Sequence, residues 1–499
     1  MKRALAAMNR WMALLAVTGL VLSPAMAAPR RDKPLEAALL AHVTELASDA
    51  YQGREPGTDG EARTLRYLAR QFFEIALVSG TNDPRHAWFA PVTLVAREPA
   101  ANAGQFQRKG KRLFLLPGSL LALTSGKRAL VENAPLLFVG KGDLVPPRAE
   151  LAGRVALLLD GAIDTSERQN ALLKGGASAV LTLLDGERTL DNVSTRRQRS
   201  GYALASDQLG GDLEAFITRE GFDRMLTGSG MDVATLAAEA AKPDFAARML
   251  DVSATLEATT RETRINTHNL IGKLPGRRPE SGAVLIVAHW DGFGICAEAP
   301  AEDTICNGAI DNASGVAALI EIARRLAKGL PLDRDVYFLA TTGEELGLLG
   351  AHAFAENPPL PLNTIVAAFN LDSVALAPAG TPLAIVGKGM TPLDPIIARV
   401  AKDQKRKLVE GDAANAYVRR QDGWALLQHD IPTVMVSSAY ADVARVERFF
   451  DGDYHRPGDQ LKPEIEFGGA AEDVLFHVAL VRWIADLKRV PTAPVSPPK

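Results

Sequence analysis

The second half of the chain alternates between short apolar runs and amphipathic segments. Continuous apolar runs predict strands at residues 284–289, 335–341, 364–372 and 432–437. Apolar residues at three- and four-residue spacing predict helices at residues 314–329, 346–357, 392–404 and 468–487. Strands that are apolar on both faces and separated by helices are typical of a parallel sheet buried between helical layers. The predicted fold class is therefore α/β, with a mostly parallel mixed sheet sandwiched by helices.

The pattern changes upstream of this region. Residues 28–95 contain two amphipathic helical patterns, at 35–48 and 60–79, on either side of the turn-rich loop YQGREPGTDG. We interpret them as the N-terminal helical part of the catalytic domain, whose remainder is residues 266–490. In residues 96–265, short β-like runs such as PLLFVG and GRVALLL alternate with Gly and Pro turns. This texture predicts a small, inserted β-rich domain.

The two ends of the chain have compositions of their own. Residues 1–27 contain Lys2 and Arg3, then an apolar stretch, then Ala25-Met26-Ala27, a pattern typical of a signal peptide. The alternative is a membrane anchor, but the apolar run is shorter than the roughly 20 residues that span a bilayer. We expect an exported protein, periplasmic or secreted, without a stable membrane anchor. The tail at residues 491–499, PTAPVSPPK, is predicted to be disordered.

Charge and cysteine content indicate which binding partners and which covalent cross-link to expect. The 499 residues carry a net charge of −3, and no long basic block suggests a nucleic-acid surface. Small molecules or peptides are the expected partners, and the oligomeric state is left open. Cys296 and Cys306, the two cysteines, lie in one loop, so an exported chain is expected to join them in a disulfide. The alternatives are two free thiols or a shared zinc, although their spacing matches no thiolate zinc site.

Polar residues collect where the predicted strands end. In open α/β sheets the ligand site lies at the carboxyl ends of the strands. Each residue alone has a common structural explanation, such as a helix cap or a solvated carboxylate. Together they predict a metal site. These residues are His289, Glu344, Glu345 and Asp372 at strand ends, and Asp311 and His455 before predicted helices.

Two histidines and three carboxylates suit two adjacent Zn²⁺ ions, with one aspartate bridging them. Such two-metal sites activate water for hydrolysis. Glu344 is then available as the general base, while its neighbour Glu345 reaches a metal. Asp291 is predicted to orient the His289 imidazole through a carboxylate that does not itself bind the metal.

Several segments resemble one known family. They are HWD at 289–291, GAIDNASG at 308–315, TTGEELGLLG at 341–350, NLD at 370–372 and YHRPGDQ at 454–460. Their order and spacing resemble the two-zinc aminopeptidases, whose relatives include glutamate carboxypeptidases and glutaminyl cyclases. The inserted segment resembles a protease-associated domain.

The resemblance implies a role for each matching residue. His289 and Asp372 would hold one zinc and Glu345 and His455 the other. Asp311 would bridge the two, with a cis peptide before Asn312. Glu344 would act as general base and then as general acid. The chain departs from the family at Gln421-Asp422-Gly423, where many relatives have Ser-Asp-His, and this puts in doubt a substrate role for the missing histidine.

The expected activity is metal-dependent removal of N-terminal residues from peptides. Four residues are predicted to line an apolar substrate pocket: Met435, Tyr440, Phe449 and Phe450. A carboxypeptidase or dipeptidase of the same fold is the alternative, and it requires a cation such as Arg419 or Arg420 facing a substrate carboxylate. A glutaminyl cyclase is disfavoured because the resemblance implies one zinc for that activity. A non-catalytic binding protein is disfavoured because all six site residues are present.

Overall fold

The computed structural model describes residues 31–82, 87–141, 144–160, 165–184, 186, 188–199, 201–207, 212–297 and 300–491. The predicted signal peptide at 1–27 lies outside these residues, as does all of the predicted tail except Pro491. Among the described residues, no helix combines the length and apolarity that a bilayer span requires.

Four parallel strands form the centre of the catalytic half. In spatial order they are β15 (Thr433–Ser437), β13 (Ile365–Asn370), β11 (Ala283–His289) and β12 (Asp335–Thr341). Every residue of these strands is buried. The short strand β14 (Ala384–Val386) joins one edge in antiparallel orientation. The predicted fold class, a mostly parallel mixed sheet, is confirmed.

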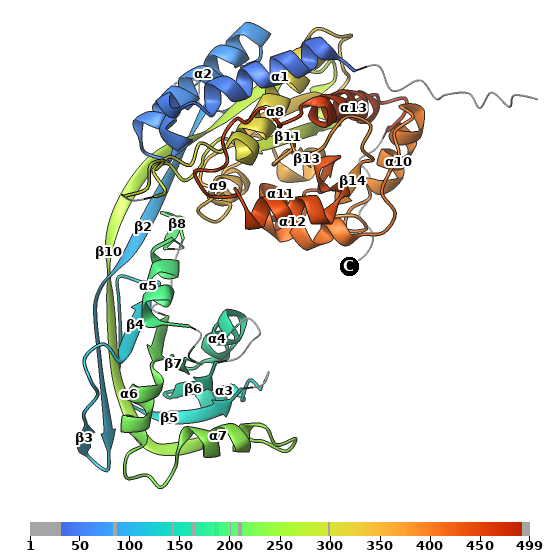
Figure 1. Cartoon of the computed structure of the whole chain (residues 1–499). Helices are drawn as coiled ribbons and strands as arrows, with labels where there is room; N and C mark the ends of the chain where they lie inside the picture. Colours follow the sequence, from blue (N-terminus) through green and yellow to red (C-terminus); the bar gives the residue numbers. More distant parts are fainter. Residues whose placement is uncertain are drawn as a thin grey trace, which may run out of the picture.

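Helices cover both faces of this sheet. One core cluster joins the sheet to α1 (Lys33–Leu46), α2 (Asp59–Ile75), α8 (Gly315–Ala327), α10 (Asp394–Asp403) and α13 (Gly468–Ile484). A second cluster joins the opposite face to α9 (Leu349–Glu356) and α11 (Asp422–Gln428). Figure 1 shows α1 and α2 as the outer layer of the first face. Helix α12 (Val443–Asp451) contributes Val446 to a further core cluster, against which Trp424 and Leu427 of α11 also pack.

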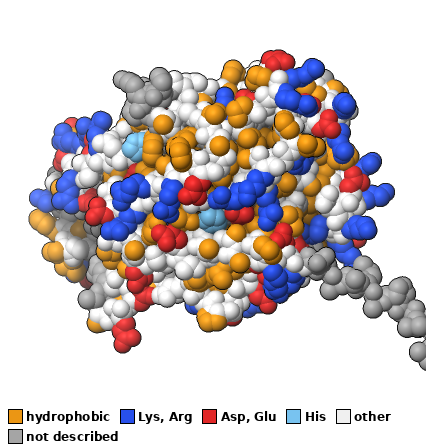
Figure 2. All heavy atoms as spheres, turned by 90° about the horizontal axis from the view of Figure 1, so that it is seen from above, with side chains coloured by type: hydrophobic (Ala, Val, Ile, Leu, Met, Phe, Trp, Pro, Cys, Tyr) orange, Lys and Arg blue, Asp and Glu red, His pale blue; other side chains and the backbone are white. Residues whose placement is uncertain are grey.

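The outer layer is amphipathic, as its sequence pattern predicts. Helix α2 buries Leu65, Leu68 and Phe72 against the core and exposes Arg63 and Arg66. Seen from this side, Lys and Arg side chains form a band that is interspersed with acidic and apolar side chains (Figure 2). The layer therefore presents a solvated face of mixed charge.

A long ribbon leads from the catalytic half to a second lobe (Figure 1). Its strands are β2 (Phe89–Arg108) and β10 (Arg248–Leu274), which pair antiparallel along nearly their whole length. The sequence-based boundaries at 95/96 and 265/266 fall inside these two strands. These strands have 20 and 27 residues, far more than the usual 3–10. Sequence patterns that assume short strands therefore place the domain boundaries inside the ribbon.

The second lobe has its own core. Its sheet orders β5 (Arg128–Gly140), β6 (Val155–Leu159), β7 (Ala179–Leu183) and β9 (Leu213–Ile217) in parallel, with β4 (Leu120–Thr124) antiparallel at the edge. Between and around these strands lie α3 (Arg148–Leu151), α4 (Thr165–Gly175), α5 (Leu190–Arg199), α6 (Arg219–Leu226) and α7 (Val233–Ala240). The lobe thus combines strands with several helices. Its likeness to a protease-associated domain stays a prediction.

The lobe also touches the catalytic half directly. Strand β8 (Tyr202–Leu204) pairs with β2 and places Leu204 in a cluster with Leu94 and Leu349. Leu349 is the first residue of α9, close in sequence to Glu344 and Glu345. The second lobe therefore packs against the segment that carries both glutamates.

Candidate metal centre

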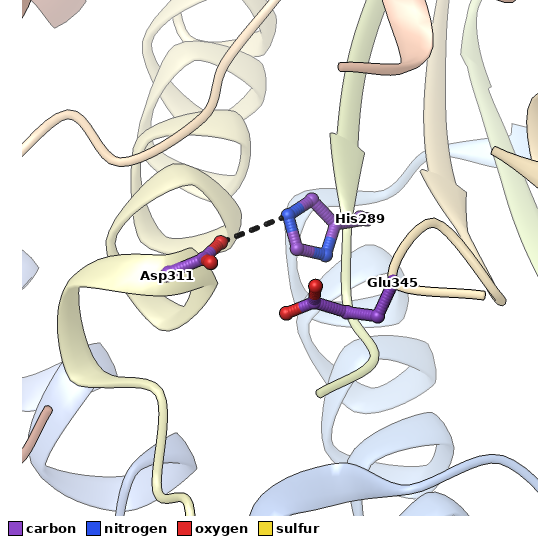
Figure 3. A group of neighbouring side chains, drawn as sticks. All are labelled: His289, Asp311 and Glu345. Atoms are coloured by element: carbon purple, nitrogen blue, oxygen red, sulfur yellow. Dashed lines mark ion pairs between the residues drawn. The ribbon is translucent and has the colours of Figure 1, made fainter. Parts of the chain in front are cut away.

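The parallel strands bring the predicted polar residues to one edge. His289 ends β11, Glu344 and Glu345 follow β12, and Asp372 follows β13. Asp311 lies just before α8, as Figure 3 shows for the group of His289, Asp311 and Glu345. The sixth residue, His455, lies between α12 and α13. Carboxyl ends of parallel strands share one edge of a sheet, so their side chains meet there.

Asp311 lies at the centre of the cluster. Its Oδ1 is 3.2 Å from Nε2 of His289, and its Oδ2 is 3.3 Å from Nε2 of His455. On the His289 side, Asp372 Oδ1 lies 3.7 Å from the same Nε2. On the other side, Glu345 Oε2 lies 2.9 Å from His455 Nε2. The two oxygens of Asp311 thus face two different donor sets.

The donors fit metal ions. His289, Asp311 and Glu345 offer ligand atoms within 4.8 Å of one another, and so do His289, Glu344 and Asp372. His289 Nδ1 lies 3.3 Å from the main-chain oxygen of Asp291, which places the imidazole hydrogen on Nδ1. Nε2 is buried and makes no well-directed hydrogen bond. Imidazole nitrogen with carboxylate oxygens is a donor set that suits zinc.

The electrostatics of the cluster lead to the same conclusion. Burial raises the pKa of Glu344 well above its usual value and that of Glu345 to about 7, with Asp311 adding repulsion at Glu345. Burial also opposes ionisation of Asp311, but the nearby imidazoles of His289 and His455 outweigh it and lower the pKa of that carboxyl. Bound cations favour ionised carboxylates. Divalent ions would therefore offset the charge that burial penalises here.

A tight turn separates the two adjacent glutamates. Gly343 adopts φ +61°, a left-handed conformation that glycine tolerates at little cost. After it, Glu344 Oε2 lies 3.9 Å from His289 Nε2, whereas Glu345 contacts His455. The turn therefore directs neighbouring carboxylates to the two sides of Asp311.

Asp291 contacts both this turn and the His289 imidazole. Its Oδ1 accepts a hydrogen bond from the main-chain N–H of Glu344 at 3.2 Å, and its Oδ2 accepts one from Glu345 at 3.4 Å. The carboxylate lies 3.8 Å from His289 Nδ1, farther than its own main-chain oxygen. The main-chain carbonyl is thus the nearer partner of the imidazole, the side chain also holds the glutamate turn, and the orienting role of Asp291 stays a prediction.

Asp459 is a supporting residue that sequence reasoning missed. Its carboxylate accepts hydrogen bonds from the main-chain N–H groups of Ile310, at 2.9 Å, and Asp311, at 3.0 Å. The peptide bond between Asp311 and Asn312 is cis, as the family resemblance implies. Asp459 belongs to the segment YHRPGDQ, so its place four residues after His455 was the available signal.

Arg54 is a second missed residue. It is 1% exposed, and its guanidinium donates to four main-chain oxygens behind the metal centre. The acceptors are Leu46, Trp290, Asn307 and Gly308, at 2.9, 2.9, 2.5 and 3.0 Å. Asn307 and Gly308 shortly precede Asp311 in the chain, and Trp290 directly follows His289. The guanidinium therefore fixes the two segments that carry these ligands relative to the N-terminal helices.

Arg54→Met should lower the free energy of unfolding by about 3–5 kcal/mol. The variant leaves several buried carbonyl groups without donors, and each such loss costs about 1–3 kcal/mol. Denaturant unfolding measures the change, with the exposed Arg63→Met on α2 as the matched control. A loss below about 1 kcal/mol, equal to that of the control, would contradict the role given to Arg54.

The loop at residues 292–307 borders the centre. Cys296 and Cys306 form the predicted disulfide, with their Cα atoms 5.7 Å apart. The N–H of Cys306 donates to Gly294, next to Phe293. The Phe293 ring lies edge-on to the His455 imidazole, with 4.4 Å between centroids. The disulfide therefore closes the loop that places an aromatic ring on a candidate ligand.

Replacing both cysteines with Ser should lower the free energy of unfolding by at most about 3 kcal/mol, the chain-entropy value for so short a loop. Thermal unfolding of the wild type and of the double variant, each with and without reductant, measures it. Reductant should shift only the wild type. An equal shift in the variant would show that the bond contributes nothing.

The predicted substrate residues divide into two groups. Met435, Tyr440 and Phe450 line one small pocket together with Asp372. Phe449 lines a different cavity, together with Asp453 and Asp459, and the predicted role of the four residues in substrate binding stays a prediction. Adjacent helical residues point about 100° apart, and this separates Phe449 from Phe450.

Known proteins share this region. Residues 269–474 match the model of peptidase family M28. The chain is 34% identical over 102 residues to the "Alkaline phosphatase isozyme conversion protein" of Escherichia coli K12, covering 19% of this chain and 29% of that protein. It is 25% identical over 260 residues to "Aminopeptidase YwaD" of Bacillus subtilis 168, covering 51% and 48%. The matches thus span less than half of either relative.

Solved structures share the fold. An aminopeptidase from Aneurinibacillus sp. strain AM-1 aligns over 93% of this chain and 96% of its own, with 20% identity and a TM-score of 0.54. At that identity the likeness establishes the architecture. The family resemblance drawn from the motifs is confirmed by the family model, and the chain therefore carries a domain of peptidase family M28 at residues 269–474.

Proposed function

We propose that the protein is a zinc-dependent aminopeptidase that hydrolyses the N-terminal peptide bond of peptides with two metal ions. The observation that carries this proposal is the position of Asp311, whose two carboxylate oxygens face His289 and His455 separately. A single carboxylate between two imidazoles is the arrangement that a pair of bridged metals requires. The aminopeptidase names of similar proteins support the activity.

The residues divide into two ligand sets. His289 and Asp372 would hold one zinc, His455 and Glu345 the other, and Asp311 both. When bound, the two ions would lower the pKa of a water toward 7 and polarise the scissile carbonyl. The free α-amine of a peptide would be recognised by a metal ion and a carboxylate of this edge, and this favours an N-terminal over a C-terminal residue at the centre.

Glu344 performs the proton transfers. Its carboxylate removes a proton from the attacking water as the new C–O bond forms. It then delivers that proton to the amine nitrogen as the C–N bond breaks. Asp291 assists from behind, because its two hydrogen bonds to the turn fix where the Glu344 side chain begins. Burial of Glu344 excludes competing water from the carboxylate.

A substrate panel tests the proposal. The purified protein should cleave peptides and aminoacyl anilides that have a free α-amine, and chelator should abolish the cleavage. N-acetylated peptides should remain intact. Cleavage of acetylated peptides from the C-terminus would instead support a carboxypeptidase. Absence of both cleavage and zinc binding would support a non-catalytic binding protein.

Export is a further part of the proposal. The basic, apolar and Ala-x-Ala segments of residues 1–27 support removal of a signal peptide and a periplasmic or secreted mature protein. Peptides in that compartment would be the substrates. N-terminal sequencing of protein from the natural source should begin at Ala28 or Pro29. An intact Met1 would contradict export by this route.

A further inference from the structure

A small pocket adjoins the metal centre. Asp372, a candidate ligand, and Tyr454 are among the residues that line it. The Tyr454 ring stacks on the His455 imidazole with 3.5 Å between centroids and 25° between planes. A group bound in this pocket therefore lies next to candidate ligands from both sides of Asp311.

Arg420 provides the cation of this pocket. Its guanidinium lies over two ring faces, 4.5 Å from the Phe450 centroid and 5.5 Å from that of Tyr454. No carboxylate among the described residues forms an ion pair with it. The neighbouring Arg419 instead lies over Trp424, at 5.2 Å, and does not line the pocket. One arginine of the adjacent pair thus faces the centre, without a carboxylate partner.

Gln421 adds an unpartnered polar group. This pocket residue is 2% exposed, and its side-chain oxygen is buried without a hydrogen-bond partner. Buried amides normally have their hydrogen bonds satisfied, so a missing partner indicates a place for a ligand or water. The amide can turn over to present either its oxygen or its NH₂ group. A guanidinium and an amide thus line the same pocket.

We propose that Arg420 and Gln421 make this pocket a carboxylate-binding subsite, an inference that rests on the proposed peptidase function. Arginine binds carboxylates through two parallel hydrogen bonds, and Arg420 is the one cation that the described part of the chain places in the lining of the pocket. The carboxylate is either the side chain of an N-terminal Asp or Glu, or the α-carboxylate of a short peptide. The apolar pocket expected from the sequence is thereby revised to one with a charged wall.

The pocket must open to admit such a group. Its free volume is about 10 Å³, the room of about one water. Among the described residues, ring faces are the contacts of the Arg420 guanidinium, so its exposed side chain turns away without breaking an ion pair. When the Arg420 guanidinium returns over a bound carboxylate, it would exchange its contacts with the two rings for hydrogen bonds to that carboxylate.

Anilides of Glu, Gln and Ala test the side-chain source, and Ala-Ala against Ala-Ala amide tests the α-carboxylate source. Wild-type kcat/KM should favour the acid over its amide in one of the two pairs. Arg420→Met should reduce that ratio about 10- to 100-fold, as expected for hydrogen bonds to a charged group. The matched control Arg419→Met should leave the ratio unchanged.

The outcomes separate the two claims. Turnover of Ala anilide with no preference for a carboxylate in either pair would overturn the subsite and leave the peptidase intact. An equal ratio in wild type and Arg420→Met would overturn it as well. If no substrate is cleaved, the proposed function fails. Calorimetry with glutamate against glutamine, in wild type and Arg420→Met, then decides whether the carboxylate subsite exists.

Discussion

Glu344→Gln should lower kcat by about 10³-fold or more, with the zinc content unchanged. General acid–base catalysis contributes about 10²–10⁴ in rate, and Glu344 is proposed to transfer the proton twice. The amide has nearly the shape of the carboxylate, and the turn is held through the main chain by Asp291, so the cluster should assemble normally. Steady-state kinetics and elemental analysis of the same preparation measure the two quantities.

The adjacent glutamate provides the control. Glu345→Gln removes a proposed ligand that lies 2.9 Å from His455, so this variant should lose zinc as well as activity. The two neighbouring substitutions should therefore separate into one that is inactive and metal-loaded and one that is metal-poor. A Glu344→Gln enzyme within tenfold of the wild type would eliminate Glu344 as the base.

Removal of the metals should abolish hydrolysis and lower the thermal unfolding midpoint. Zinc that binds the folded state alone stabilises it by RT ln(1 + [Zn]/Kd), about 4 kcal/mol at a thousand times Kd. In the apo protein, burial disfavours the charged forms of Glu344 and Glu345, so the folded state also loses the cations that offset their charge. Scanning calorimetry with and without chelator measures the shift.

Added zinc should restore both activity and stability. Asp311→Asn is the matched variant, because Asp311 is proposed to hold both metals. Chelator should shift its midpoint much less than that of the wild type. Full activity in the presence of excess chelator, or an identical shift in Asp311→Asn, would contradict a site centred on Asp311.

The candidate ligands were predictable because parallel strands impose their own geometry. His289, Glu344 and Asp372 each follow a continuous apolar run, and the carboxyl ends of such strands meet at one edge. Their convergence follows from topology alone. The loop residues Asp311 and His455 were included for their residue types and their places before predicted helices, and their positions in space do not follow from strand order.

The supporting residues were missed because their partners are main-chain groups. Arg54 binds carbonyl oxygens from three separate segments, and Asp459 binds two consecutive N–H groups. No residue type in the sequence marks such a partner. Asp291 shows the same limitation, because its position two residues after His289 suggested an imidazole partner but not its hydrogen bonds to the main chain of the glutamate turn.

Element ends differed where local backbone geometry overrides hydrophobic spacing. Helix α2 ends at Ile75 rather than Ser79 because Ala76 turns left-handed and residues Val78–Ser79 form β1, which pairs with β10. Helix α9 begins at Leu349 rather than Leu346 because the N–H groups of Gly347 and Leu348 bond back to Glu344. The segment that looked like the first helical turn instead closes the loop carrying the two glutamates.

The most direct test of the two-metal aminopeptidase is a zinc titration of the apo protein while cleavage of a peptide with a free α-amine is followed. We predict that activity appears with zinc, saturates at two equivalents per chain, and is absent for the N-acetylated form of the same peptide. Activity that is independent of zinc, or equal cleavage of the free and acetylated peptides, would contradict the account.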